Sequence, residues 1–387
     1  MITTSLSSEI VRGAAELEPT ARGLRPHRLP VWVREQFPDP QLLMVEQQPS
    51  GVRIAVTTAA REIELVVHPS RVAYRGADRD RGAIDLVVDN ELTASSPLAG
   101  GDLFEVDLQT GASRFEPGAM HVARFEGLSA GEKQLELWLP HNESLELVEL
   151  RSDLPLVPAA SDGLLWLHHG SSISHGSNAV SPTRIWPVVA ARRAGVELRN
   201  LGLGGSALVD PFLARVIRDA AADVISVKLG INVVNLDAMR RRAFVPAVHG
   251  FVDMIRDGHP ETPLLLVSPI FCGIHEHTPG PGTVDPSTIG TDQVRFTATG
   301  RPGDTDLGRL TLEVIRDALR EVAATRTGDP HFHYLEGTDL YGEEDAVSHP
   351  LPDALHPDTG THQLIGERFA DRAFGPGGPF PAASRSS

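Results

Sequence analysis

The sequence has one cysteine, a deficit of positive charge and no long apolar run, and each of these features excludes a class of protein. The single cysteine, Cys272, means that no disulfide framework can form within the 387-residue chain. Lysine and arginine together number 35, against 51 aspartate and glutamate residues, so the formal net charge is −16. This charge argues against a nucleic-acid or anionic-membrane partner, because both attract basic surfaces.

No window of the sequence approaches the length of apolar residues that a membrane-spanning helix needs. The N-terminal stretch MITTSLSSEIVRGAAELEP contains acidic residues and lacks the apolar segment of a secretory signal. We therefore expect a cytoplasmic protein.

A chain of this length suits two domains, and its pattern changes near residue 155. Before that point, short segments rich in β-branched or alternating apolar residues are separated by Gly, Pro, Asp and Asn. They predict a jelly-roll-like β-sandwich over residues 36–155, preceded by an N-terminal arm over residues 1–35. The predicted strands are residues 41–45, 52–57, 62–67, 83–88, 103–108, 121–125 and 134–139.

Apolar runs and amphipathic stretches alternate over residues 160–375, which predicts a parallel sheet covered by helices on both faces. The predicted strands are residues 164–167, 198–203, 224–229, 264–270 and 332–335, and the predicted helices are residues 184–194, 207–221, 236–257, 306–324 and 361–373. The Pro- and Gly-rich segment 271–305 fits no element, and a loop this long is typically a lid, a specificity loop or disordered. We expect residues 376–387 to form a disordered tail.

Two adjacent serines, Ser171 and Ser172, follow the first strand of the predicted parallel sheet in the stretch HHGSSISHG. Ser-Gly runs are common in turns, so this stretch alone does not distinguish a turn from a nucleophile. A nucleophilic serine requires a base, a partner for that base and donors to an oxyanion.

Polar or glycine-rich groups follow three further strands, and each group can have either a functional or a purely structural role. The second strand runs into NLGLGGSAL, where Gly205 permits close backbone approach to a ligand or a tight turn. The third ends in KLGIN, where Asn232 donates into a site or caps a helix. After the fifth, Asp353 orients the imidazole of His356, or both lie on an ordinary surface loop. Together the four groups belong at one edge of one sheet, because sites form at the carboxyl ends of parallel strands.

These four blocks resemble those of the SGNH, or GDSL, hydrolase superfamily. The matching segments are Gly170-Ser171-Ser172-Ile173-Ser174, Asn200-Leu201-Gly202-Leu203-Gly204-Gly205, Gly230-Ile231-Asn232 and Asp353-Ala354-Leu355-His356. Two positions depart from the family pattern, since Ser171 and Val233 stand where Asp is usual. The resemblance covers about residues 163–373 and implies a flavodoxin-like α/β/α sandwich with a five-stranded parallel sheet.

The resemblance also implies a role for each block. Ser172 is the expected nucleophile, His356 its base and Asp353 the residue that orients the base. The backbone N–H groups of Ser172 and Gly205 and the side chain of Asn232 are the expected oxyanion hole. The resemblance implies no metal and no cofactor.

A weaker resemblance concerns the N-terminal half of the chain. Some branches of the superfamily carry an N-terminal β-sandwich with a Gly-x-Asp-Leu-Tyr motif, and Gly100-Gly101-Asp102-Leu103-Phe104 is similar, with Phe in place of Tyr. The branch so implied is carbohydrate-esterase-like. Whether the sandwich binds sugar or supports the site stays open, as does the oligomeric state.

The histidine pairs HH at 168–169, HEH at 275–277 and HFH at 331–333 invite a metal site. No carboxylate or third histidine lies at a diagnostic spacing from them, so we expect no metal. His168 and His169 are expected to support the nucleophile turn, and Cys272 is expected to be a buried or loop thiol without a nucleophilic role.

The function hypothesis is a serine esterase that removes short acyl groups, acetyl above all, from a sugar, glycoside or other small metabolite through an acyl-enzyme at Ser172. One alternative is an acyltransferase that uses the same residues to pass the acyl group to an acceptor alcohol. The other is a non-catalytic glycan- or protein-binding module on the same scaffold. The expected partner is a small-molecule or carbohydrate ester, with no nucleic acid and no membrane.

Overall fold

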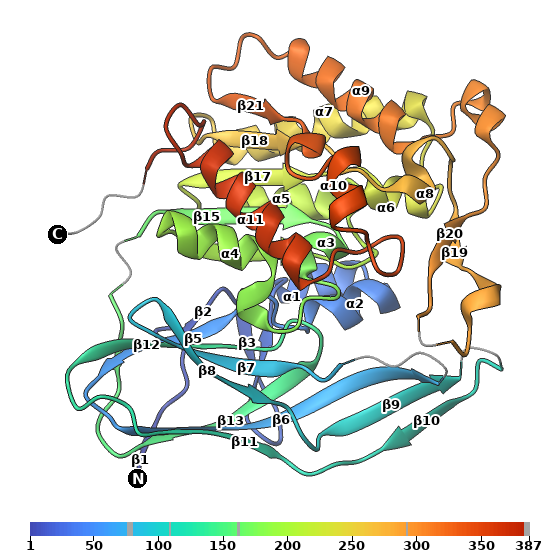
Figure 1. The fold of residues 1–387 in the computed structure, drawn as a ribbon. Coiled ribbons are helices and arrows are strands. Elements are labelled where there is room, and N and C mark those ends of the chain that lie inside the picture. Colours follow the sequence, from blue (N-terminus) through green and yellow to red (C-terminus); the bar gives the residue numbers. More distant parts are fainter. Residues whose placement is uncertain (76–79, 108–109, 161–162, 292, 383–387) are drawn as a thin grey trace. The chain divides into compact units, whose positions relative to one another are not determined.

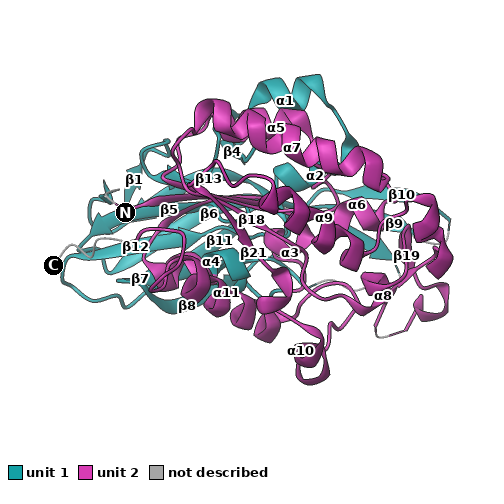
Figure 2. Cartoon of the chain, turned by 90° about the horizontal axis from the view of Figure 1, so that it is seen from above, with its two compact units in different colours: residues 1–162, 179–188 teal, residues 163–178, 189–387 magenta. Residues whose placement is uncertain are grey.

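The computed structural model describes residues 1–75, 80–107, 110–160, 163–291 and 293–382. The chain forms two compact units, shown as a ribbon in Figure 1 and coloured separately in Figure 2. Unit 1 comprises residues 1–162 and 179–188, and unit 2 comprises residues 163–178 and 189–387. Part of the predicted sandwich (residues 76–79 and 108–109) and residues 383–387 of the predicted tail lie outside the described residues.

Unit 2 is built on a parallel sheet with the strand order β16-β15-β17-β18-β21. Its strands are β15 (Leu165–Gly170), β16 (Glu197–Gly202), β17 (Val224–Lys228), β18 (Leu264–Val267) and β21 (Phe332–Leu335). All neighbouring pairs are parallel, and the inner strands β17 and β18 are buried throughout. The predicted five-stranded parallel sheet is therefore confirmed, and each strand matches a predicted apolar run.

Helices cover both faces of this sheet, as the view from above shows (Figure 2). Helices α4 and α11 lie on one side, and α5 and α7 lie on the other, where α9 packs against α7. These helices are α4 (Trp186–Ala194), α5 (Pro211–Asp219), α7 (Arg241–Gly258), α9 (Leu312–Ala324) and α11 (Thr359–Ala373). Shorter helices are α3 (Ser172–His175), α6 (Ile231–Asn235), α8 (Gly273–Glu276) and α10 (Glu343–Ser348).

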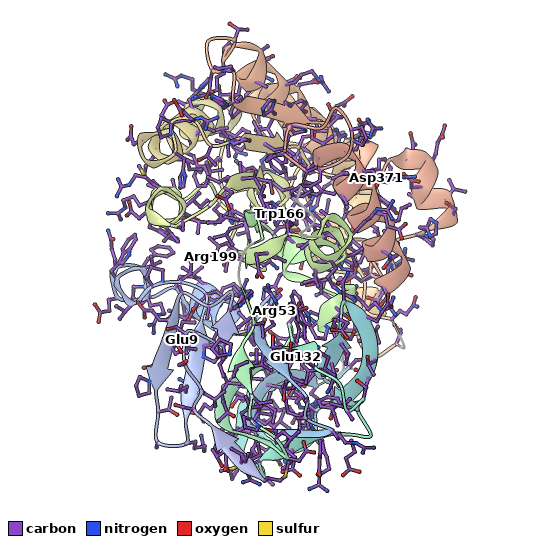
Figure 3. All side chains as sticks on the ribbon, turned by 90° about the vertical axis from the view of Figure 1, so that its left-hand side faces the viewer. Glu9, Arg53, Glu132, Trp166, Arg199 and Asp371 are labelled. Carbon is purple, nitrogen blue, oxygen red and sulfur yellow. The ribbon has the colours of Figure 1, made fainter. Side chains whose placement is uncertain are left out.

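Trp166 of β15, labelled in Figure 3, is fully buried in unit 2. Its ring stacks on Phe369 of α11 at a centroid distance of 4.9 Å, and its indole N–H donates to Ser226 Oγ at 2.8 Å. The described part of the predicted tail extends this packing, because Phe380 is 3% exposed and its ring meets Phe374 at 5.1 Å. Phe380, which lies in the predicted tail, therefore packs against the residue that ends α11.

The segment 271–305 contains regular structure that the sequence did not predict. It holds α8, the antiparallel strands β19 (Gly282–Val284) and β20 (Phe296–Ala298), the 3₁₀ turn η2 (Pro286–Thr288) and the start of η3 (Pro302–Leu307). Among its described residues, this segment is therefore a folded hairpin rather than an irregular loop.

Unit 1 is rich in strands, as predicted, and they form two sheets. One contains β1 (Ile2–Thr4), β3 (Glu16–Pro19), β4 (Leu24–His27), β6 (Glu62–Arg75), β9 (Asp102–Asp107), β10 (Ser113–Glu116), β11 (His121–Glu126) and β13 (Ser144–Ser152). The other contains β2 (Val11–Arg12), β5 (Arg53–Thr58), β7 (Ala83–Val88), β8 (Glu91–Pro97), β12 (Lys133–Trp138) and β14 (Val157–Pro158). Alternate apolar side chains from both sheets form one buried cluster, which includes Ile54, Leu65, Leu86, Leu137 and Leu147.

The predicted N-terminal arm is part of these sheets. Strand β1 pairs with β13, β2 pairs with β5, and the β3–β4 hairpin extends the larger sheet through β13. Helix α1 (Val31–Gln36) follows.

The prediction of a strand over residues 41–45 is wrong, because these residues lie in helix α2 (Pro40–Glu46). The Asp39 side chain accepts the Leu42 N–H at 2.8 Å, and Pro40 occupies the first helical position, where its missing N–H is no disadvantage. Leu42 and Val45, three residues apart, are both buried, which is helical rather than strand spacing.

A buried carboxylate explains why residues 179–188 belong to unit 1. Asp85 of β7 is fully buried and accepts hydrogen bonds from Ser181 Oγ at 2.6 Å, Thr183 Oγ1 at 2.6 Å and Thr183 N–H at 3.1 Å. Ser95 Oγ on the neighbouring strand β8 donates to its other oxygen at 2.6 Å. Because a buried carboxylate needs such donors, this segment and β7 stabilise each other.

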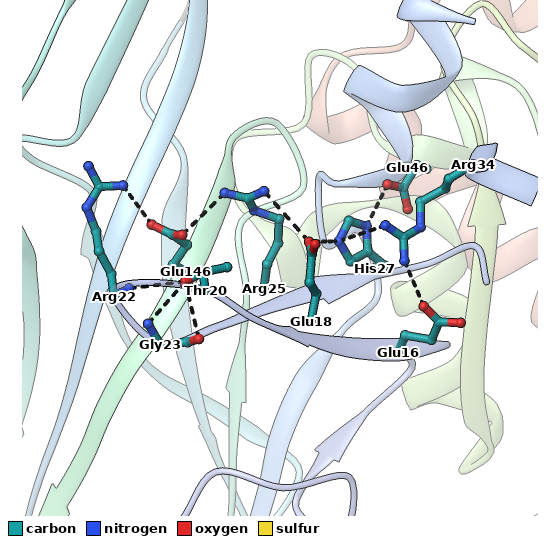
Figure 4. Close-up of polar contacts among 10 residues, drawn as sticks. All are labelled: Glu16, Glu18, Thr20, Arg22, Gly23, Arg25, His27, Arg34, Glu46 and Glu146. Atoms are coloured by element: carbon teal, nitrogen blue, oxygen red, sulfur yellow. Dashed lines mark hydrogen bonds and ion pairs between the residues drawn. The ribbon is translucent and has the colours of Figure 1, made fainter. Parts of the chain in front are cut away.

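A chain of ion pairs fixes the β3–β4 hairpin within unit 1 (Figure 4). His27 is 1% exposed and lies between Glu46, fully buried, at 2.7 Å and Glu18 at 2.8 Å. Arg28, also fully buried, lies next to this group, and burial lowers its pKa to about 10 despite the nearby Glu46 charge. The outer members of the chain are Glu16, Arg22, Arg25, Arg34 and Glu146.

Glu46→Gln is expected to lower the free energy of unfolding by about 3 kcal/mol, because it removes the buried charge that contacts His27 Nδ1 and lies near the buried Arg28. Urea unfolding followed by far-UV circular dichroism measures the change. The matched control is Glu116→Gln, which removes an ion pair to Arg114 whose side chains are 48% and 57% exposed, and a change of less than about 1 kcal/mol is expected there. Equal effects of the two substitutions would contradict the buried ion-pair assignment.

Candidate active site

The nucleophile candidate lies at the turn between β15 and α3. Ser171 is the N-cap of α3, and its hydroxyl faces the N–H of Ile173, so it serves the helix end. Ser172 is the first residue of α3, and its Oγ lies 3.0 Å from His356 Nε2. Ser171 therefore has the structural role of a turn residue. Ser172, in contrast, contacts the predicted base, His356.

The loop after η4 (Gly337–Asp339) and α10 brings Asp353 and His356 together. Asp353 Oδ2 lies 2.7 Å from His356 Nδ1, and its Oδ1 accepts the backbone N–H groups of Leu355 at 2.9 Å and His356 at 2.6 Å. Ala354 between them has a positive φ of 67°, which closes this tight turn. The three predicted residues therefore form a continuous hydrogen-bonded chain from Ser172 through His356 to Asp353.

Asn178 is a further contact of this carboxylate that the sequence did not single out. Its side-chain N–H donates to Asp353 Oδ2 at 3.1 Å, so the oxygen that faces the imidazole has two partners. Burial by itself would raise the pKa of Asp353, but the hydrogen bonds from the His356 ring, the His356 charge and the two backbone N–H groups outweigh it and hold the pKa at about 2. Asp353 is therefore ionised at neutral pH.

Asn232 lies in the first turn of α6 and is 4% exposed. Its Oδ1 accepts the N–H of Ala207 at 3.1 Å, and it makes no capping hydrogen bond to the helix, so the helix-cap alternative is wrong. Because the carbonyl oxygen of Asn232 accepts this hydrogen bond, its amide N–H groups are the atoms that can donate to another group. The contact also ties α6 to the turn after β16, where Gly205 has a φ of +71°.

Gly202, at the end of β16, has a packing role. A Cβ on this residue would lie 2.4 Å from the backbone of Ser174 and His175 in α3, so only glycine lets the helix approach the strand this closely. Asn200 adds to the contact, because its side-chain N–H donates to Ser174 O at 2.9 Å.

Buried histidines fix the nucleophile turn from beneath. His168 contacts Ser226 Oγ at 2.7 Å and Ser174 Oγ of α3 at 2.8 Å, and His169 contacts Leu201 O at 2.8 Å. His362 of α11 contacts Ser177 O at 2.9 Å. Burial lowers the pKa of His169 and of His362 to about 4 and that of His168 far below its usual value, so all three rings are neutral at pH 7.

Among the described residues, no group of three or more His, Cys, Asp or Glu side chains has an arrangement suited to a metal ion. Cys272 is buried, its thiol faces Ala354 O at 3.4 Å, and burial raises its pKa to about 12. In the part of the chain that the structure describes, no helix combines the length and apolar character that crossing a membrane requires.

Unit 2 thus combines a parallel sheet of this order with a hydrogen-bonded Ser172-His356-Asp353 chain at the ends of its strands. Residues 167–273 match the model of the GDSL-like lipase/acylhydrolase family. Unit 2 thus carries a GDSL-like lipase/acylhydrolase domain with the SGNH fold, as the sequence predicted. No curated protein matches the chain.

Solved structures resemble the whole chain rather than unit 2 alone. The salicylyl-acyltransferase SsfX3 from a tetracycline biosynthetic pathway is 27% identical, with a TM-score of 0.76 over 92% of each chain. A GDSL-like lipase from Bacteroides ovatus is 16% identical, with a TM-score of 0.65 over 93% of each chain. A family two carbohydrate esterase from Clostridium thermocellum is 15% identical, with a TM-score of 0.54 over 83% of this chain and 91% of that one.

Acidification is expected to destabilise the protein between about pH 6.5 and about pH 4, because His169 and His362 stay neutral in the folded state while the unfolded chain takes up protons. The stability from each ring is fully present above about pH 6.5 and falls by about 3 kcal/mol toward pH 4. Urea unfolding at several pH values measures this slope, and His362→Asn is expected to reduce it. An unaltered slope in His362→Asn would contradict the explanation.

Asp353→Asn is expected to lower kcat/KM roughly 10³- to 10⁴-fold with p-nitrophenyl acetate, because an amide no longer stabilises the imidazolium or selects its tautomer. Asp371→Asn is the matched control, since that carboxylate pairs with Arg193 on the surface of α11 and is 63% exposed. Wild-type activity in Asp353→Asn would exclude this carboxylate from the reaction.

Proposed function

We propose that unit 2 is a serine-dependent carboxylic ester hydrolase that works through an acyl-enzyme at Ser172. The observation that carries the proposal is the chain of contacts from Ser172 Oγ to His356 Nε2 at 3.0 Å and from His356 Nδ1 to Asp353 Oδ2 at 2.7 Å. Binding a ligand does not require a hydroxyl, an imidazole and an ionised carboxylate that contact one another in series. This geometry therefore favours catalysis over the non-catalytic alternative.

In the first half-reaction, Ser172 Oγ attacks the ester carbonyl carbon while His356 Nε2 takes the hydroxyl proton. The carbonyl oxygen becomes an oxyanion, which the N–H groups of Ser172, Gly205 and the Asn232 side chain stabilise, at about 3 kcal/mol for each donor. His356 then donates its proton to the leaving alcohol as the ester C–O bond breaks, and the acyl-enzyme remains.

In the second half-reaction, a water molecule gives a proton to His356 and adds its oxygen to the acyl carbon. The tetrahedral intermediate collapses, the proton returns to Ser172 Oγ, and the carboxylic acid leaves. Asp353 keeps its negative charge throughout and stabilises the imidazolium in each half-reaction, which its pKa of about 2 permits.

The substrate class that we propose is a short acyl ester, acetyl above all, of a sugar, glycoside or other small metabolite. The four sequence blocks and the shared fold with a family two carbohydrate esterase support this choice. A second candidate is transfer of the acyl group to an acceptor alcohol instead of water. The full-length likeness to the salicylyl-acyltransferase SsfX3 favours it, because the two activities share the first half-reaction.

A fluorophosphonate probe is expected to label the wild-type protein once, with the adduct mapped to Ser172 by mass spectrometry of the intact chain and its peptides. Ser172→Ala is expected to lose both the label and the hydrolysis of p-nitrophenyl acetate, with an unchanged circular dichroism spectrum. The control is Ser171→Ala, which keeps the reactive hydroxyl and is expected to retain labelling, since Ser171 serves the end of α3. Absence of labelling in the wild-type protein would overturn the proposed function.

Two further measurements separate the candidates. Release of acid from acetyl, butyryl and longer esters tests the acyl preference, and much faster cleavage of butyryl and longer chains would exclude the acetyl assignment. Hydrolysis measured with increasing glycerol or glucose tests transfer, because an acyltransferase forms the new ester in preference to the free acid.

A further inference from the structure

The segment between β18 and α9 carries an element outside the proposed reaction machinery. We call residues 279–291 and 293–300, which include β19 and β20, the 279–300 hairpin. Its strands pair with Thr283 opposite Thr297, and its base is closed by hydrogen bonds from Thr299 N–H to Pro281 O at 2.9 Å and from Gly300 N–H to Pro279 O at 3.1 Å.

One side of the hairpin lies directly against α6, the helix that carries Asn232. A Cβ on Gly280 would lie 1.8 Å from Val234 O, and one on Gly282 would lie 2.0 Å from Asn235 Oδ1. The same Asn235 oxygen contacts His275 Nε2 of α8 at 3.1 Å. At Gly280 the hairpin backbone therefore meets the α6 backbone directly, and at Gly282 it meets the Asn235 side chain of α6.

The other side of the hairpin contacts the Asp353–His356 turn at two points. The backbone N–H of Phe296 donates to Asp353 O at 2.8 Å. The Phe296 ring meets the His356 imidazole edge to face, with centroids 5.5 Å apart and an interplanar angle of 79°. Since both ring nitrogens of His356 already have partners, this contact limits the remaining freedom of the imidazole to tilt.

We propose that Phe296 is a positioning residue for the acyl-transfer reaction. Its N–H and ring hold the Asp353–His356 turn against α6, so that the imidazole stays within hydrogen-bonding distance of Ser172. The inference rests on the proposed function. Phe296 acts through His356 and requires no contact with the substrate.

Phe296→Ala is expected to lower kcat roughly 10- to 100-fold, because a small displacement of a catalytic group has effects of this size. KM is expected to change less than about threefold, because substrate binding is not removed. The loss is expected to be equal for p-nitrophenyl acetate, butyrate and benzoate, and labelling by the fluorophosphonate probe is expected to slow by a similar factor. Phe296→Tyr keeps the ring and is expected to restore the wild-type rates, whereas Phe296→Leu restores them in part.

A second variant acts on the hairpin away from the ring. Gly282→Val places a side chain against Asn235 Oδ1 and is expected to displace the hairpin and reproduce the loss of kcat, although position 282 has no described contact with His356. Val347→Ala, at a side chain 84% exposed on α10, is the control and is expected to leave every rate unchanged. Thermal unfolding of each variant establishes that it is folded.

The outcomes are distinct. Wild-type labelling and turnover in folded Phe296→Ala would overturn the positioning role, as would a loss confined to the bulkier acyl groups, which is the signature of a substrate-contacting wall. Failure of the wild-type protein itself to react with the probe would instead overturn the proposed function.

Discussion

The carboxylate of Asp353 is the interaction on which the rest of the site depends. It is largely buried, and burial favours its neutral form, yet the His356 imidazole and two backbone N–H groups together keep its pKa at about 2. The same hydrogen bonds that keep the charge also fold the turn from Asp353 to His356. Charge and geometry are therefore set by one group, and the imidazole is aimed at Ser172 because the carboxylate stays ionised.

The sheet explains why residues as far apart in the sequence as Ser172 and His356 meet. Parallel strands end at the same edge, so the turns after β15, β16 and β17 and the loop beyond β21 converge there. Convergence alone does not fix a nucleophile to within a fraction of an ångström. That precision comes from the contacts of α3 with the sheet. Neutral buried histidines contact α3 and the neighbouring strands, and Gly202 lets α3 pack against the backbone of β16.

The parts of this structure that follow a period or a motif were predictable from the sequence, and the parts that depend on tertiary contacts were not. The first group contains the five strands of the parallel sheet, the helices between them, and the positions of Ser172, Asn232, Asp353 and His356. The apolar run of residues 41–45 is too short to distinguish a strand from a helix by its period, and the signal that does distinguish them is the Asp39-Pro40 helix start. The pairing of residues 179–188 with β7 depends on one buried carboxylate, Asp85, and the 279–300 hairpin depends on glycines that fit against α6; neither leaves a local pattern.

The contacts of the 279–300 hairpin connect this long segment to the rest of the site. Outward motion of the hairpin would break the hydrogen bond from Phe296 to Asp353 and withdraw the ring from His356. It would also separate Gly280 and Gly282 from α6, the helix of Asn232. Displacement of the hairpin would therefore disturb the Asp353–His356 turn and the packing on α6 in the same step. The position of the hairpin is thus coupled to both groups of residues.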